Sequence, residues 1–92
     1  MTRLSRSATI VNVKGLHARA SAKFVTFVSR LPEGIKVEVE KDGQFVTGTS
    51  IMGLMMLGAA KGDHIVISAS GPQADQALAA LCELVENKFG EE

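Results

Sequence analysis

The sequence predicts an α+β fold in which one sheet of four strands carries three helices on a single face. Short runs with strand-like alternation are interleaved with stretches of helical periodicity, and glycine or proline separates most of them. The resulting order is β-α-β-β-α-β-α, which fits one mixed or antiparallel sheet. The order β-α-β-β-α-β is also that of the ferredoxin-like superfold, which hosts many activities, so the fold alone leaves the function open.

Length and composition predict a single domain over residues 1–92. The chain is 46% hydrophobic, enough for one core at this size. Ten basic residues balance ten acidic ones, which argues against a nucleic-acid-binding protein, because such proteins carry a basic excess or patch. The single cysteine, Cys82, fits a reducing compartment. No apolar run resembles a signal peptide or a membrane span, so we expect a cytoplasmic monomer that binds no membrane.

The first half of the chain alternates between strand and helix signals. Residues Ser7–Val13 are rich in β-branched side chains and end at Lys14-Gly15, which predicts a first strand. Apolar residues recur at helical spacing from Ala18 to Leu31, and Pro32 then ends the helix. Residues Ile35–Glu40 alternate strictly, which predicts a strand with its odd-numbered side chains toward the core.

The second half begins with a hairpin and ends with an alanine-rich helix. Asp42-Gly43 is a strong hairpin signal that leads into a short strand, Gln44–Thr47. Residues Ile51–Leu57 form a short apolar helix, and His64–Ser70 form the fourth strand. Gly71-Pro72 opens the last helix, which carries one apolar stripe along its length.

Residues 15–19, Gly-Leu-His-Ala-Arg, lie where the first strand gives way to the first helix. The glycine permits a sharp turn, and His17 falls at or just before the first helical residue. The free backbone N–H groups of Ala18, Arg19 and Ala20 then point back toward its ring. A helix N-terminus binds phosphate through such unpaired donors and the partial positive charge of the macrodipole.

The chemistry of this segment indicates phosphoryl transfer. The guanidinium of Arg19 is a permanent, planar cation that suits phosphate oxygens. An imidazole nitrogen is a competent nucleophile at neutral pH. No carboxylate lies in the segment, so we expect nothing near the histidine to repel an anion. The pattern predicts that His17 receives a phosphoryl group and gives it up; the alternative is a surface histidine that merely caps a helix.

Gly-Leu-His-Ala-Arg closely resembles the active-site signature of the HPr family, the histidine phosphocarriers of the bacterial phosphoenolpyruvate-dependent phosphotransferase system. A second stretch, Thr49–Met55, resembles the segment around the regulatory serine of that family. The resemblance covers nearly the whole chain and implies an open-faced sandwich of four antiparallel strands under three helices. It also implies that Enzyme I phosphorylates His17 on Nδ1, that Arg19 contacts the phosphoryl group, and that an A-type component of enzyme II receives it.

Such a protein is a stoichiometric carrier and not an enzyme, and we expect it to need neither a cofactor nor a metal. The family usually has proline directly after the arginine, where this chain has Ala20. Proline in a first helical turn fixes φ, whereas alanine is the best helix former, so the helix start should survive the replacement. The departure leaves open whether the protein serves sugar uptake or the nitrogen-related regulatory branch.

Ser50 precedes the short apolar helix and is predicted to be its N-cap. The resemblance also makes it a regulatory site, which would add an HPr kinase/phosphorylase to the partners. An alternative function is therefore an HPr-like regulatory interaction protein controlled by phosphorylation of Ser50. A short helix on one face of a sheet cannot bury its whole circumference, so Ile51, Met52 and Met55 are predicted to form a docking patch. The alternative is a methionine-filled core.

Two other residues of reactive types are predicted to be structural. His64 opens a strand and has no partner at metal-ligand spacing. Cys82 lies beside Leu81 on the last helix and is expected to be a small buried apolar residue.

Overall fold

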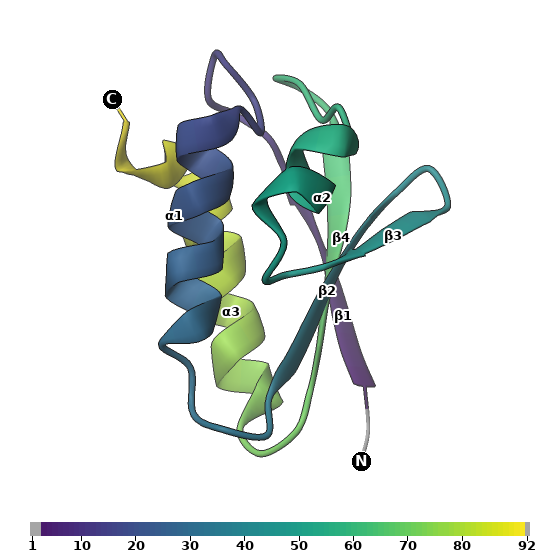
Figure 1. Ribbon diagram of the computed structural model, residues 1–92, viewed down its shortest axis with the longest axis vertical. Helices are drawn as coiled ribbons and strands as arrows, with labels where there is room; N and C mark the ends of the chain where they lie inside the picture. Colours follow the sequence, from purple (N-terminus) through teal and green to yellow (C-terminus); the bar gives the residue numbers. More distant parts are fainter. Residues whose placement is uncertain (1–2, 92) are drawn as a thin grey trace.

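The computed structural model describes residues 3–91 (Figure 1). The elements in chain order are β1 (Arg3–Thr9), α1 (Ala18–Ser29), β2 (Lys36–Lys41), β3 (Gln44–Thr47), α2 (Ile51–Met56), β4 (His64–Ser70), α3 (Ala74–Glu86) and a final 3₁₀ turn (Lys88–Gly90). The predicted order of strands and helices is confirmed. The 3₁₀ turn after α3 was not expected from the sequence.

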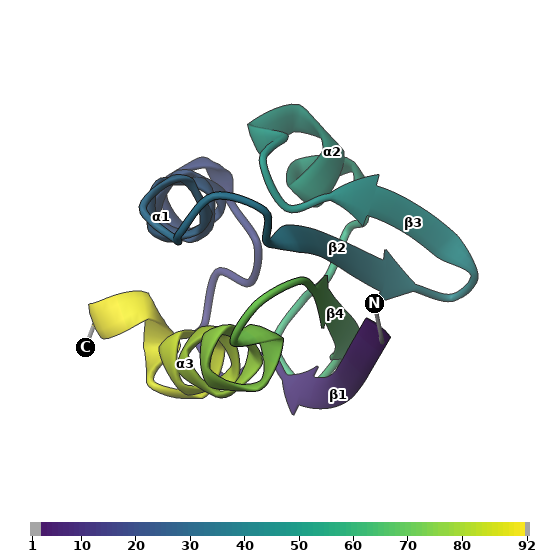
Figure 2. The same cartoon turned by 90° about the horizontal axis from the view of Figure 1, so that it is seen from below.

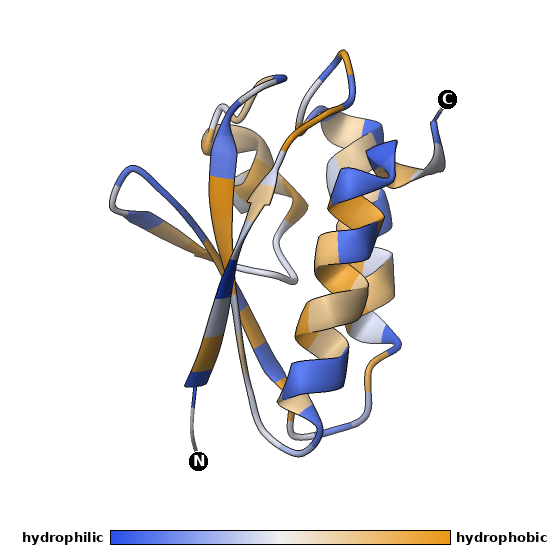
Figure 3. Cartoon of the chain, turned by 180° about the vertical axis from the view of Figure 1, so that it is seen from behind, coloured by the Kyte–Doolittle hydropathy of each residue, from blue (hydrophilic) through white to orange (hydrophobic). Residues whose placement is uncertain are grey.

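The four strands form one sheet in the order β1-β4-β2-β3, and every neighbouring pair is antiparallel. This excludes the mixed sheet that the sequence also allowed. Figure 2 shows the helices gathered on one side of the sheet, with the other side open. Figure 3 shows polar and apolar residues alternating along the strands, as a sheet with one covered face requires. The predicted open-faced sandwich is therefore confirmed.

A single hydrophobic core fills the space between the sheet and the helices. Val39 of β2 and Ile67 of β4 are fully buried and belong to the same core as Phe24 of α1 and Leu81 of α3, which are also fully buried. These positions follow the two-residue period of the strands and the helical period predicted from the sequence. Within residues 3–91, no helix is both long and apolar enough to cross a membrane.

The predicted first strand, Ser7–Val13, is wrong at both ends. β1 spans Arg3–Thr9, and Thr9 pairs with His64, the first residue of β4. Beyond this point the chain turns, and Val13 is 67% exposed in a loop. β-branched composition is a weak guide because strand preference depends on which face is buried. β1 is an edge strand with one open face, so polar residues such as Ser5 fit there, and Ser5 hydrogen-bonds Ser68 of β4 at 2.9 Å.

The loop between β1 and α1 is fastened to the segment that precedes β4. The Gly62 N–H donates to the Ile10 carbonyl at 2.7 Å, and the Leu16 N–H donates to the Ala59 carbonyl at 3.0 Å. Gly15 makes this contact possible: its φ is +63°, and a Cβ added there would lie 2.4 Å from the Ala59 oxygen. Only glycine fits both constraints. The loop therefore delivers the following residues to the start of α1 in a fixed position.

Gly15→Ala should destabilise the protein more than the same substitution at a glycine that has the same backbone conformation but free space around it. Gly58 is the matched control, because its φ is +65° and no atom lies within 4 Å of an added Cβ. We expect Gly58→Ala to cost about 1–2 kcal/mol for the left-handed conformation alone. Gly15→Ala should cost at least about 1 kcal/mol more, because the Ala59 carbonyl must move. Chemical denaturation measures both, and equal losses would contradict a close contact at Gly15.

Candidate functional site

His17 is the residue immediately before α1, as the sequence predicted. Its backbone is extended, with φ −74° and ψ −179°, and its carbonyl accepts the Ser21 N–H at 2.9 Å, the first hydrogen bond of the helix. The N–H groups of Ala18, Arg19 and Ala20 consequently have no intrahelical acceptor. The His17 side chain does not cap the helix and is 23% exposed. The arrangement combines a reachable imidazole with free backbone donors.

A carboxylate lies against this imidazole, contrary to the expectation that none would be near it. Oε2 of Glu91 is 2.7 Å from Nε2 of His17, and the Glu91 side chain is only 14% exposed. The expectation was wrong because it considered only the local segment, whereas the two residues are 74 positions apart. Among residues 3–91, Nδ1 of His17 makes no hydrogen bond, so the two ring nitrogens differ in environment.

The chain reversal after α3 brings Glu91 to His17. Lys88 and Phe89 both have positive φ, 59° and 52°, which turns the chain back toward α1. The Phe89 ring is buried in the core, and Lys23 of α1 donates to the Phe89 carbonyl at 2.9 Å. Figure 1 shows this segment, in yellow, beside the N-terminal half of α1. Two non-glycine residues held in the left-handed region are costly, and such positions often mark functional sites.

Asn12 joins Glu91 to the loop that carries His17. Its side chain is fully buried, and its Nδ2 donates to the Gly15 carbonyl at 2.8 Å and to Oε1 of Glu91 at 3.0 Å. Its Oδ1 is the one buried side-chain nitrogen or oxygen within residues 3–91 that has no hydrogen-bond partner. Each oxygen of the Glu91 carboxylate therefore has its own partner, Asn12 on one side and His17 on the other.

The surroundings of Glu91 keep it ionised. Partial burial raises the pKa of Glu91. Hydrogen bonds with His17 and Asn12, together with attraction to His17 and Lys23, lower this pKa by more than burial raises it. The resulting pKa lies below that of an ordinary glutamate. At neutral pH the group is a carboxylate, which only accepts hydrogen bonds. The Nε2 atom of His17 must therefore carry the hydrogen of the 2.7 Å contact.

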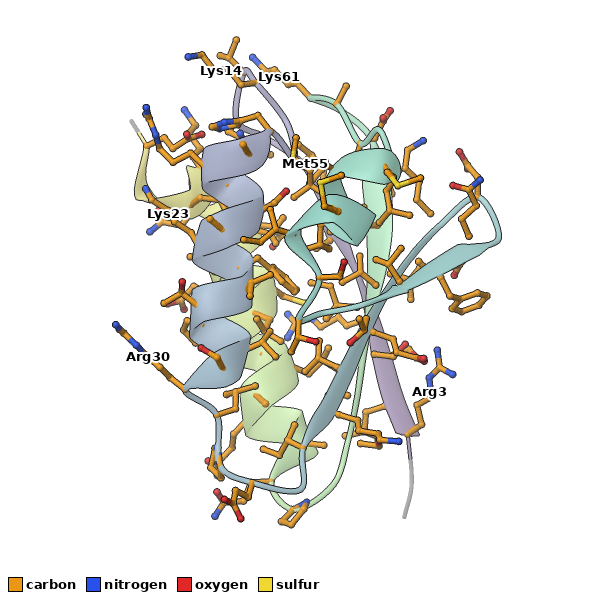
Figure 4. The ribbon with its side chains drawn as sticks, in the orientation of Figure 1. Arg3, Lys14, Lys23, Arg30, Met55 and Lys61 are labelled. Carbon is orange, nitrogen blue, oxygen red and sulfur yellow. The ribbon has the colours of Figure 1, made fainter. Side chains whose placement is uncertain are left out.

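Exposed cations lie at the same end of the molecule as His17. Arg19, Lys14 and Lys61 are exposed and make no ion pair with any residue from 3 to 91. Figure 4 shows Lys14 and Lys61 projecting at the end where α1 begins, on the two segments that the loop contacts join. Their sequence positions gave no sign of this grouping. Such a group of cations raises the local concentration of anions.

Ser50 is the N-cap of α2, as predicted. Its Oγ accepts the Gly53 N–H at 2.9 Å, and its backbone is extended. Short hydroxyl side chains stabilise helix starts in this way because they satisfy an otherwise free N–H.

The exposure of α2 agrees with the predicted patch, with one addition. Ile51, Met52 and Met55 are exposed, whereas Leu54 and Leu57 are buried. This contradicts a wholly buried, methionine-filled core. Met56, which was not included in the predicted patch, is the most exposed at 76% and lines a hollow with Phe45 and Val46 on the β3 side of the helix. Met55 instead lies on the side of α2 that faces α1 (Figure 4).

His64 and Cys82 occupy positions apart from this site. Nδ1 of His64 lies 3.0 Å from the Thr9 hydroxyl on the paired strand, so the side chain joins β4 to β1. Cys82 is a buried free thiol, and burial raises its pKa, which makes it a poor nucleophile.

The family of the protein follows from comparison with known proteins. A family model described as the PTS HPr component phosphorylation site matches residues 4–87. The chain belongs to the HPr family. The phosphocarrier protein HPr of Pseudomonas aeruginosa is 47% identical to this HPr-family chain over 83 residues, which is 90% of this chain and 91% of that protein. The resemblance seen in the sequence is thereby confirmed.

Two further comparisons support the family and the fold. The phosphocarrier protein NPr of Shewanella violacea is 41% identical over 92 residues and covers 99% of this chain and 98% of that protein. A crystal structure of HPr from Thermoanaerobacter tengcongensis has a TM-score of 0.84 at 41% identity and covers 100% of this chain and 99% of that one. This HPr-family chain is therefore similar to phosphocarriers over its whole length.

Proposed function

We propose that this protein carries phosphoryl groups in a phosphoenolpyruvate-dependent phosphotransferase system. Phosphorylated Enzyme I transfers its phosphoryl group to Nδ1 of His17, and an A-type component of enzyme II then removes it. The observation that carries the proposal is the position of His17: it immediately precedes a helix whose first N–H groups are free, and its Nδ1 makes no hydrogen bond within residues 3–91. The protein is a stoichiometric carrier that works in the cytoplasm without a cofactor.

The surroundings of His17 suit the charge changes of this transfer. A phosphoryl group on Nδ1 brings anionic oxygens to the helix start, where the N–H groups of Ala18, Arg19 and Ala20 can donate to them. The exposed guanidinium of Arg19 has no partner within residues 3–91. It can therefore bind the same oxygens without first breaking another interaction. Donors that are already in place stabilise developing charge with little rearrangement.

We assign partner docking to the exposed side of α2. Ile51, Met52 and Met55 offer an apolar surface, and methionine adapts to partners of different shape. Ser50 lies at the start of this surface, so its phosphorylation by an HPr kinase/phosphorylase would place a dianion at its edge. The acceptor belongs to sugar uptake or to the nitrogen-related branch, and the relatives above include both an HPr and an NPr.

His17→Ala should abolish phosphorylation by Enzyme I and phosphoenolpyruvate while leaving the protein folded. The half-buried ring lies outside the hydrophobic core, so its removal creates no core cavity. Intact-protein mass spectrometry should show one added phosphoryl group on the wild type and none on the variant. His64→Ala is the matched control and should be labelled like the wild type. Labelling of the His17→Ala protein would disprove the assignment of the acceptor.

Arg19→Ala should slow phosphoryl transfer to and from His17 by about 10- to 100-fold. This effect is somewhat smaller than the slowing seen when a buried oxyanion donor is removed. The free energy of unfolding should change by less than about 0.5 kcal/mol, because an exposed side chain that has no partner within residues 3–91 adds little to stability. Arg30→Ala is the matched control, since Arg30 is an exposed arginine at the other end of α1. Rapid-quench measurements give the rates; equal rates in both variants would show that the helix N-terminus suffices.

Substitutions along α2 should separate docking from packing. Ser50→Asp retains a good N-cap, so the fold should be kept while the added charge raises the KM for phosphorylation by Enzyme I. Met55→Ala should raise the same KM about fivefold, equivalent to about 1 kcal/mol of lost apolar contact. Met56→Ala makes the same change on the β3 side of the helix and should have little effect. Initial rates against carrier concentration give KM; unchanged values for Ser50→Asp and Met55→Ala would rule out docking on this helix.

A further inference from the structure

We propose that Glu91 is a positioning residue for phosphoryl transfer at His17. Its carboxylate keeps the imidazole proton on Nε2 through the whole transfer cycle, so that Nδ1 always carries the lone pair that attacks phosphorus. The inference rests on the proposed function, because it concerns the same histidine. It adds to that function a residue far from the signature segment, and it explains which of the two ring nitrogens reacts.

The contact between the two side chains allows only one tautomer of a neutral ring. An ionised carboxylate accepts hydrogen bonds and cannot donate them, so at 2.7 Å from Oε2 the Nε2 atom must be the donor. A neutral imidazole holds one hydrogen, which leaves Nδ1 as the nitrogen with the free lone pair. A carboxylate that orients a catalytic imidazole through the nitrogen opposite the reacting one is also the arrangement in serine proteases.

The position of the carboxylate is fixed from several directions. The buried Asn12 amide donates to Oε1 at 3.0 Å, and the Glu91 N–H donates to the Lys88 carbonyl at 2.9 Å. The preceding Phe89 is anchored in the core, and its carbonyl accepts from Lys23. A side chain held at both oxygens and along its backbone is preorganised, so little entropy is lost when it orients the ring.

The charges balance in each direction of transfer without any proton leaving the ring. The Nδ1 lone pair forms the N–P bond while the bond between phosphorus and the donor breaks and its electron pair stays with the donor. The ring then carries both Nε2–H and Nδ1–P and is positively charged, and the Glu91 carboxylate faces that charge. When the acceptor attacks phosphorus, the N–P electron pair returns to Nδ1 and the neutral ring is restored. The carboxylate faces the nitrogen opposite the phosphoryl group, where it does not obstruct the incoming anion.

Nitrogen-15 NMR of the His17 ring tests the contact in the unphosphorylated protein. With the ring neutral, the wild type should show a protonated Nε2 and an unprotonated Nδ1, with a strongly hydrogen-bonded Nε2–H. In Glu91→Gln the carboxylate charge is gone, so both shifts should move toward the averaged values of a ring that exchanges between tautomers. Glu83→Gln removes the same charge from an exposed residue of α3 and should leave the wild-type shifts. Unchanged His17 shifts in Glu91→Gln would overturn the proposal.

Single-turnover kinetics then test whether the contact matters for transfer. Glu91→Gln should lower the rate constant of transfer at saturating Enzyme I by about tenfold, whereas KM stays near that of the wild type, because the largely buried carboxylate offers a partner little surface. Glu83→Gln should match the wild type in both. If the wild type and Glu91→Gln are phosphorylated at the same rate, the positioning role is wrong but the proposed function stands. If Enzyme I cannot label the wild type at all, the proposed function itself is wrong.

Discussion

The register of β1 against β4 is the constraint on which the site depends. Because Thr9 pairs with His64, the loop after β1 and the turn before β4 leave the sheet at the same end. Hydrogen bonds between Gly62 and Ile10 and between Leu16 and Ala59 then join the two segments. The start of α1 is consequently held by the sheet as well as by its own hydrogen bonds. A slip of one residue would turn the core face of β1 to solvent and would move His17 away from its partners.

Much of the fold was predictable because its signals are local. The Asp42-Gly43 hairpin signal predicted β3 to the residue, and the apolar residues on one face of His64–Ser70 did the same for β4. Helical spacing together with Ser50 placed the start of α2 correctly. β1 was misplaced for two reasons. An edge strand with one open face can contain polar residues, so its composition is a weak signal. Ile10, in contrast, is a buried β-branched residue that lies outside any strand.

The site was predictable only in part. His17 at the start of α1 could be predicted, since glycine, histidine and a helical pattern lie next to one another. Glu91 and Asn12 could not, because their roles arise from a chain reversal through Lys88 and Phe89, neither of which is a residue type that favours positive φ. The grouping of Lys14 with Lys61 likewise comes from tertiary contacts and leaves no run of charge in the sequence.

The layout of the chain also has a practical consequence for protein engineering. Arg3 lies at the end of the sheet away from the start of α1 (Figure 4), whereas Glu91 touches His17. An affinity tag or fluorescent fusion joined ahead of Arg3 begins at the far end of the molecule. The same addition made after Glu91 starts beside His17, within reach of whatever protein approaches it. For surface immobilisation or labelling, the N-terminal side is therefore the attachment point that leaves the imidazole accessible.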